Sequence, residues 1–407
     1  MTRVQRRKFQ QTVPARRPIQ RLPALILCMV WGLCAGADWQ LDITPDNALY
    51  PALDLSQAQR SAATPQATDG RVVGAGSGLI QVELRANHDA ERVALRLDAE
   101  YLSHPVDLVA TLPRAGERYV LRPALAWDIA ALSTLQEIRT VNIILSLQRG
   151  DAPVQQIQRE VRLHPMQEAL YYVRDGSEHV DLSWIFAAYA DPQSAVVDAM
   201  LAQAQRAHPE LPFDGYASRD AAAVIAQAFA LWEVLEQRGV RYADEDPGLA
   251  RGPQIWSQRV RLHDDVWNQR RANCLDGSLL LAAALERLGV RSVLLLVPRH
   301  ALLAFYPLRQ DGEPVFVETT LLGARRLAAA APRAFLSELS HPDADALRSF
   351  SAALDAGRTR HARDAAGFRR RTPDYQWIDL AIARSYGIMP LPEASRRSAP
   401  ATVDGGR

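Results

Sequence analysis

The sequence predicts an α+β protein in which an antiparallel β-sandwich precedes a domain that combines helices and strands. Three observations predict this class: apolar and polar residues alternate with period two over residues 79–163, apolar residues recur at helical spacing beyond residue 191, and strand-like apolar runs return at residue 292. The chain has 407 residues, of which 48% are hydrophobic and 23% are charged. This composition is typical of a globular protein, and the length favours two or more domains.

The first 37 residues are expected to be a signal peptide. They carry seven basic residues and no acidic one, and an apolar run from Leu22 ends in the small residues Ala35, Gly36 and Ala37. The run is shorter than a typical membrane span. Cleavage after Ala37 would release an exported protein, periplasmic or extracellular, and an uncleaved N-terminal membrane anchor is the alternative.

The charge and the cysteine content of the remaining chain limit the classes of function that are expected for it. Removing the seven basic residues of the signal peptide from the total of 47 leaves 40 against 46 acidic residues, a net charge of −6. Such a mildly acidic chain is not expected to bind nucleic acid. Cys28 and Cys34 lie in the signal peptide, so Cys274 is the single cysteine of the mature chain. It is either a small buried hydrophobe or a free reactive thiol.

Six alternating runs separated by short polar stretches predict the β-sandwich. A longer stretch, residues 127–136, is expected to form a short helix between strands. Residues 38–78 are rich in Pro, Ala, Asp and Gly and are expected to form a flexible segment with room for one strand. The predicted strands are residues 79–86, 92–101, 106–112, 118–123, 140–148 and 154–163.

Two helices are predicted in the second half, one beginning near Asp191 and Pro192 and one running from Ser218 to Gly239. Residues 241–272 have few periodic apolar positions, so a long surface segment is expected there. Long loops of this kind are often functional.

A cysteine at the start of a helix is the first sign of a catalytic site. Asn273 is a favourable N-cap residue, and the apolar positions that follow define a helix that ends at Gly289. Cys274 therefore lies in the first turn. The partial positive charge and free N–H groups at this end favour a thiolate and can bind an oxyanion.

A histidine and an acid follow on two predicted strands. His300 comes directly after the apolar run 292–298, and Glu318 lies in the run "VFVETTLL". A turn at Asp311 and Gly312 would pair these strands in an antiparallel hairpin and bring His300 beside Glu318. A thiol nucleophile needs a base, and the base needs a carboxylate to orient it. Cys274, His300 and Glu318 fit these roles, although a buried cysteine, a strand-end histidine and a solvated glutamate are the structural alternatives.

Three motifs, "NCLDGSLLLAAALERLGV", "LLLVPRHALLAF" and "VFVETTLL", resemble the transglutaminase-like, papain-related cysteine peptidase superfamily, and its bacterial exported branch most of all. The resemblance covers about residues 165–345, and "YQWIDLAIARSYGIMPLP" near the C-terminus is also typical of that branch. It implies that Cys274 is the nucleophile, His300 the base and Glu318 the orienting acid. The superfamily more often has Asp at the third position, so Glu318 is a departure. Relatives complete the oxyanion hole with Gln or Trp, and Gln258 and Trp267 are both candidates here.

Asp276 and the group formed by His263 and the two aspartates after it also need an interpretation. Asp276 is expected to complement the helix dipole, since a carboxylate so close to Cys274 would oppose thiolate formation. His263 stands beside Asp264 and Asp265, but no second histidine follows at ligand spacing, so neither a metal nor a cofactor is expected.

The resemblance implies an exported enzyme that transfers acyl groups from peptide or side-chain amides through a thioester on Cys274, with hydrolysis favoured over cross-linking. The expected substrate is a protein or peptide, with the cell envelope as one source, and membrane contact is expected only through an uncleaved signal segment. A non-catalytic binding or scaffold protein that retains the fold is the alternative. The predicted boundaries are a signal peptide at 1–37, a flexible segment at 38–78, a β-sandwich at 79–165, a transglutaminase-like domain at 166–345, a C-terminal helical extension at 346–391 and a disordered tail at 392–407.

Overall fold

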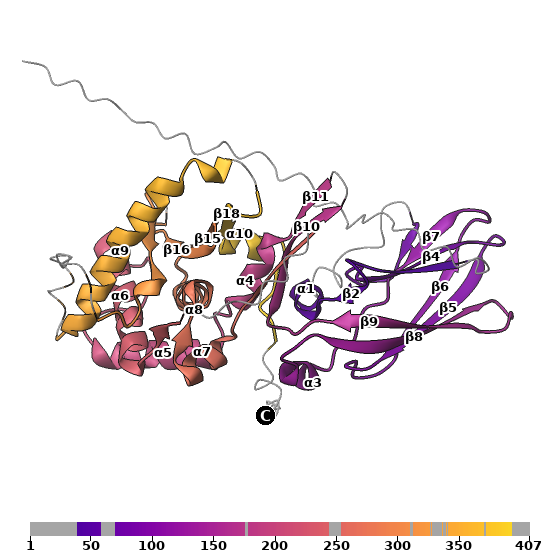
Figure 1. Cartoon of the computed structure of the whole chain (residues 1–407), viewed down its shortest axis with the longest axis horizontal. Helices are drawn as coiled ribbons and strands as arrows, with labels where there is room; N and C mark the ends of the chain where they lie inside the picture. Colours follow the sequence, from indigo (N-terminus) through magenta and orange to yellow (C-terminus); the bar gives the residue numbers. More distant parts are fainter. Residues whose placement is uncertain are drawn as a thin grey trace, which may run out of the picture. The chain divides into compact units, whose positions relative to one another are not determined.

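Helices and several β-sheets make up the chain, which confirms the α+β class (Figure 1). The computed structural model describes residues 39–57, 70–175, 178–243, 254–309, 312–325, 327, 336, 339, 341–369 and 372–392. The predicted signal peptide, Asp311 and all of the predicted tail except Pro392 lie outside the described residues.

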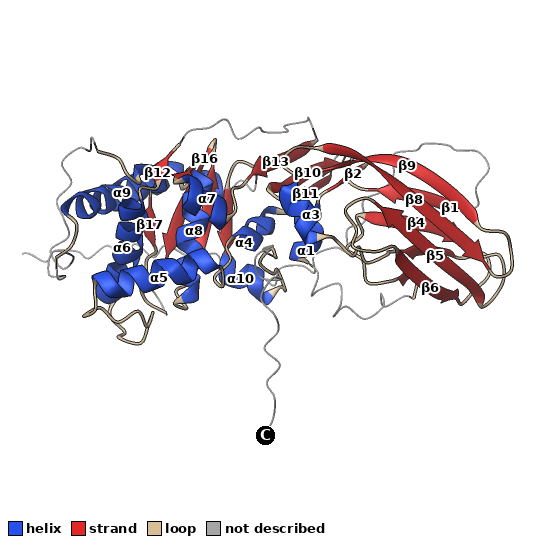
Figure 2. Cartoon of the chain, turned by 90° about the horizontal axis from the view of Figure 1, so that it is seen from below, coloured by secondary structure: helices blue, strands red, loops and turns tan. Residues whose placement is uncertain are grey.

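Two sheets contain the strands between residues 39 and 163 (Figure 2). The first has the order β1-β4-β7-β3 and the second the order β2-β9-β8-β5-β6. All six predicted strands are confirmed, and they pair with one another in antiparallel fashion. The short helix α3 is also confirmed, and Asp128 caps it by accepting a hydrogen bond from the N–H of Ala131. The bounds are β1 Trp39–Ile43, β2 Ala48–Leu49, β3 Val72–Val73, β4 Ile80–Arg85, β5 Glu91–Ala99, β6 Val106–Leu112, β7 Arg118–Leu121, α3 Ile129–Thr134, β8 Arg139–Arg149 and β9 Gln155–Leu163.

In the segment 38–78, the described residues 39–57 and 70–78 differ from the flexible segment that was predicted. It contains β1, β2, β3 and the helix α1 (Pro51–Ser56), and β1 pairs along its whole length with β4. Trp39, Leu41 and Ile43 alternate and are buried, so a period-two strand is present despite the Pro- and Asp-rich composition. The alternating pattern of β1 is only five residues long, and the composition of the whole segment did not reveal it.

Helices surround a second group of strands. β10 lies between β11 and β13, and the order of the four-stranded sheet is β17-β16-β15-β18. α8 packs against β15 and β16 of that sheet. The bounds are β10 Glu168–Asp175, β11 Glu178–Asp181, η1 Ser183–Ile185, α4 Phe186–Tyr189, α5 Ala195–Ala207, α6 Ala221–Arg238, β12 Arg241–Tyr242, β13 Ile255–Arg259, α7 His263–Gln269, β14 Arg271–Ala272, α8 Cys274–Arg287, β15 Ser292–Val297, β16 His300–Phe305, β17 Val315–Val317, η2 Thr319–Leu321, α9 Ala344–Asp364, η4 Gly367–Arg369, β18 Gln376–Asp379 and α10 Leu380–Ser385.

The two predicted helices are α5 and α6. Ser194 caps α5, and Asp220 caps α6 through the N–H of Ala222. Gly239 ends α6 in a left-handed conformation with φ of 84°, which glycine adopts at little cost. None of the described helices is both long and apolar enough to span a membrane.

The interpretation of 241–272 as a surface segment was wrong for its described part. β13 pairs with β10, and α7 follows it, with Ser257, Val260 and His263 all buried. Polar side chains can be buried when they form hydrogen bonds, and Ser257 donates to Glu168 at 2.5 Å. Residues 244–253 lie outside the described residues.

A helical extension was predicted for residues 346–391, but this segment is not helical throughout. It contains β18, which pairs with β15 and completes the four-stranded sheet. All six residues of β15 are buried, as expected for a strand covered on both faces. On one face Leu294 and Leu296 belong to the main hydrophobic core, and on the other Val293 and Leu295 form a smaller cluster with Phe316.

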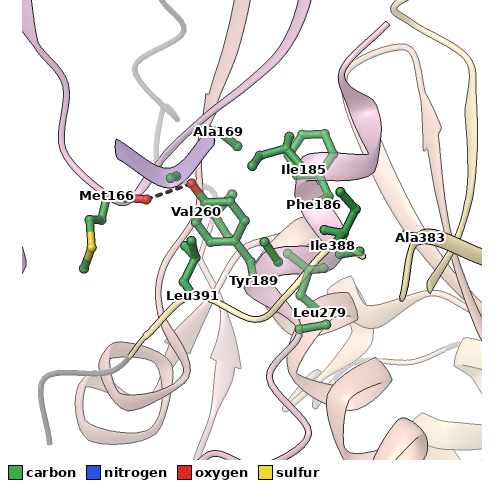
Figure 3. Packing of buried hydrophobic residues seen from close by; sticks show 14 of the residues in the cluster. Met166, Ala169, Ile185, Phe186, Tyr189, Val260, Leu279, Ala383, Ile388 and Leu391 are labelled. Carbon is green, nitrogen blue, oxygen red and sulfur yellow. Dashed lines mark hydrogen bonds between the residues drawn. The ribbon is translucent and has the colours of Figure 1, made fainter. Parts of the chain in front are cut away.

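Buried side chains pack α8 against α4 and against the C-terminal segment (Figure 3). Leu279 of α8 lies in one cluster with Tyr189 of α4 and with Ile388 from the C-terminal segment. The Tyr189 hydroxyl donates a 2.7 Å hydrogen bond to the carbonyl of Met166, so this buried polar group is satisfied. Segments far apart in the sequence therefore pack around the helix that begins with Cys274.

Candidate active site

Cys274 is the first residue of α8. The Asn273 side chain accepts 2.9 Å hydrogen bonds from the N–H groups of Leu275 and Asp276, and the Asp276 carboxylate accepts from the N–H of Asn273 at 3.1 Å. This capping box confirms the predicted N-cap. The cap occupies the N–H groups of Leu275 and Asp276, and no acceptor for the N–H of Cys274 is found among the described residues. The thiol is free and half-buried.

His300 and Glu318 lie side by side. His300 begins β16, directly after a two-residue turn that joins it to Val297 of β15. Its Nε2 atom lies 2.7 Å and 2.9 Å from the two carboxylate oxygens of Glu318. The hydroxyl of Thr320 donates to the same carboxylate at 2.7 Å, and the N–H of Thr320 donates at 3.2 Å. The carboxylate is therefore fixed from two sides.

The run "VFVETTLL" predicted that Glu318 lies in a strand, but this prediction was wrong. β17 ends at Val317, and Glu318 is the N-cap of the short helix η2. The run had a strand-like composition, but the Glu318 side chain competes for the N–H of Thr320 and thereby turns the backbone. The predicted antiparallel pairing of the two strands is confirmed for β16 and β17.

The Cys274 thiol lies near His300, since it is among the groups that raise the pKa of that histidine. Because Nε2 is occupied by Glu318, Nδ1 is the ring nitrogen left for the thiol. Burial lowers the pKa of His300, but the hydrogen bonds to Cys274 and Glu318 outweigh it and raise the pKa from 6.5 to about 9. Burial raises the pKa of Glu318, and the contact with His300 overrides that effect and lowers it. An imidazolium beside a carboxylate is therefore the neutral-pH state.

We expect the imidazole of His300 to titrate near pH 9 in the folded protein, to be observed by long-range ¹H–¹⁵N NMR. Its folded-state pKa exceeds the unfolded value of 6.5, so its contribution to stability is complete below that value and is lost as pH rises through about 9. Cys274→Ser should lower the midpoint, because a neutral hydroxyl replaces a thiol that supports the cation. A midpoint at or below 6.5 in the wild type would contradict the ion pair.

The two oxyanion candidates, Gln258 and Trp267, each contact a neighbouring arginine. The amide of Gln258 donates at 3.1 Å to the carbonyl of Arg259. The ring of Trp267 lies under the Arg238 guanidinium, whose central carbon is 4.8 Å from the ring centroid. The N–H of Cys274 at the start of α8 is a further backbone donor at this place.

Asp276 has the structural role that was expected. It is 1% exposed, and besides closing the capping box it accepts 2.9 Å hydrogen bonds from the N–H and the guanidinium of Arg261. Burial raises its pKa, and the bonds from Arg261 and Asn273 oppose that shift. The carboxylate thus ties residue 261 to the start of α8.

His263 also supports the fold. Its ring is buried, and Nδ1 lies 3.1 Å from the hydroxyl of Ser194, which caps α5. Burial, and then the neighbouring Asp264, raise the pKa of Asp265.

Three hydroxyl residues at the site were missed from the sequence. Thr320 holds Glu318, and Thr319 and Ser278 both donate to the carbonyl of Cys274, at 3.0 Å and 2.6 Å. The available signals were the two threonines after the acid and a serine one helical turn after the cysteine.

A comparison with protein-family models finds none that matches this chain, and a comparison with curated proteins finds no matching relative. Its function is therefore inferred from the geometry of the site.

Proposed function

We propose that this chain is an exported, transglutaminase-like cysteine enzyme that transfers acyl groups from peptide or side-chain amides. In this proposal an N-terminal β-sandwich precedes a transglutaminase- or papain-like domain. The observation that carries the proposal is the placement of Cys274 next to His300, whose Nε2 atom lies 2.7 Å from the Glu318 carboxylate. Nucleophile, proton carrier and orienting acid need this order.

The imidazolium of His300, paired with the Glu318 carboxylate, determines the order of the proposed chemical steps. The Cys274 thiolate attacks the amide carbonyl carbon and forms a carbon–sulfur bond, and the N–H of Cys274 stabilises the resulting oxyanion. His300 starts as the imidazolium and gives its Nδ1 proton to the leaving nitrogen, so that the carbon–nitrogen bond breaks and a thioester remains. Neutral His300, held by Glu318, then takes a proton from water, whose oxygen attacks the thioester. Release of the acid restores the thiolate and the imidazolium.

Hydrolysis is the proposed main outcome, and attack by an amine in place of water would give cross-linking. The proposed setting is the periplasm or the medium, because the first 37 residues have the composition of a signal peptide. We propose proteins or peptides as substrates, with cell-envelope peptides as the first class to assay.

The test is alkylation of the mature protein by iodoacetamide at neutral pH, followed by mass spectrometry of the peptide that contains Cys274. Because Cys28 and Cys34 fall within the first 37 residues, Cys274 is the one thiol of the mature chain. We expect the folded protein to react about tenfold faster than the same chain unfolded in denaturant, because only the folded chain holds His300 beside the sulfur.

The matched control is His300→Gln, which removes the cation and should bring the rate down to that of the unfolded chain. A wild-type rate no faster than that of the unfolded chain would contradict the proposal. It would leave the scaffold alternative as the function to pursue.

A further inference from the structure

We propose that Thr319 is a positioning residue that fixes the start of α8 against the loop that carries Glu318. This inference rests on the proposed function and adds a residue that touches neither the substrate nor the reacting atoms. Thr319 follows Glu318 directly, and its hydroxyl donates a 3.0 Å hydrogen bond to the carbonyl of Cys274. One residue thus connects the backbone of the orienting acid to the backbone of the nucleophile.

The contact is buried and close. Thr319 is 2% exposed, so water does not compete for its hydroxyl. A Cβ atom added to Gly277 would lie 3.3 Å from the Cβ of Thr319, which is tighter than most such contacts. Glycine inside a helix costs about 1 kcal/mol relative to alanine. Gly277 therefore fits a helix whose first turn must approach Thr319 closely.

Glu318 needs such support because it lies beyond the end of β17, outside the regular sheet. Its N–H donates to the carbonyl of Ala353 at 3.0 Å, and this bond ties it to α9. The bond from Thr319 ties the same loop to α8. Catalytic groups must be held to within a fraction of an ångström, since a displacement of about 1 Å can cost about 100-fold in rate.

Ser278 separates two explanations for the Thr319 bond. Its hydroxyl donates to the same Cys274 carbonyl at 2.6 Å and lies 3.1 Å from the hydroxyl of Thr319. Ser278 belongs to the same helix as Cys274, so its bond to the carbonyl joins no second element, and it reaches η2 only through the hydroxyl of Thr319. If the carbonyl merely needs a partner, loss of either hydroxyl has the same effect. If the connection matters, the loss of Thr319, which removes both links to η2, has the larger effect.

The experiment compares Thr319→Val with Ser278→Ala in the full mature chain. Two quantities are measured: the rate of Cys274 alkylation by iodoacetamide as a function of pH, and the NMR titration midpoint of His300. We expect Thr319→Val to slow alkylation at neutral pH about tenfold and to lower the His300 midpoint, because the thiol moves away from the ring. Ser278→Ala should change both much less than Thr319→Val does, and Thr319→Ser should restore both.

Equal effects of Thr319→Val and Ser278→Ala would overturn the inference, as would a Thr319→Val protein with wild-type rate and midpoint. If Thr319→Val does not fold, Thr319→Ala provides the same comparison, with near-UV circular dichroism as the check on packing. The two proposals fail differently. An unactivated thiol in the wild type contradicts the enzyme, whereas an activated thiol indifferent to Thr319 contradicts only the positioning role.

Discussion

Glu318→Gln is expected to leave the acylation of Cys274 largely intact and to slow deacylation by about 10³- to 10⁴-fold. Glu318 accepts from Nε2 of His300 at 2.7 Å, and that contact decides which ring nitrogen carries the proton. A glutamine can present its NH₂ group to Nε2 and so reverse the tautomer. Nδ1 would then carry the proton of neutral His300 and could not take one from water.

p-Nitrophenyl acetate separates the two steps. Its leaving group departs without being protonated, so acylation of Cys274 needs a thiolate but no proton from His300. We expect a burst of about one p-nitrophenol per chain in both the wild type and the variant, with a much slower steady state in the variant. Stopped-flow absorbance records both phases.

Glu318→Asp is the matched control, since it keeps the charge but shortens the side chain by one methylene. The contact to both carboxylate oxygens at 2.7 Å and 2.9 Å would be lost, so its steady-state rate should lie between those of the wild type and Glu318→Gln. A steady state that is unchanged in Glu318→Gln would remove Glu318 from the mechanism. Loss of the burst would show that the carboxylate is needed to form the thiolate as well.

The elements that were predicted correctly share a strong local pattern. Strand β8 alternates over eleven residues, and α6 has both an Asp N-cap and a Gly at its end. Each of these signals is contained within the element itself. Strand β1 has only five residues in a Pro-rich neighbourhood, and β13 is held by pairing with β10, a partner more than 80 positions away in the sequence. Tertiary pairing decides such short strands.

Local patterns also predicted part of the candidate site, but not all of it. The helix start at Cys274 follows from its N-cap, and the meeting of His300 with Glu318 follows from the hairpin. That Glu318 lies beyond the strand end depends on the hydrogen bonds of its own side chain. The contact between Thr319 and Cys274 depends on how α8 packs against η2, which no local pattern encodes.

Asp276→Ala is expected to lower the free energy of unfolding by about 3 kcal/mol, the largest stability change that we predict around the site. The carboxylate is 1% exposed and accepts from the guanidinium of Arg261 and from the N–H groups of Arg261 and Asn273. Burial penalises the ionised form, so the intact pair contributes little net stability. Its removal takes one buried acceptor from the N–H groups of Arg261 and Asn273 and from the Arg261 guanidinium, and the loss of these bonds is destabilising.

Urea denaturation of Asp276→Ala and Asp265→Ala gives the comparison. Asp265 is also an acid near the start of a helix, but burial, and then like-charge repulsion from Asp264, raise its pKa. We therefore expect Asp265→Ala to leave the free energy of unfolding nearly unchanged or slightly higher. Asp276→Asn keeps one carbonyl oxygen as an acceptor and should fall between the two. If Asp276→Ala were as stable as Asp265→Ala while Cys274 lost its reactivity, Asp276 would belong to the chemistry, because a cap that costs nothing to remove does not hold the helix.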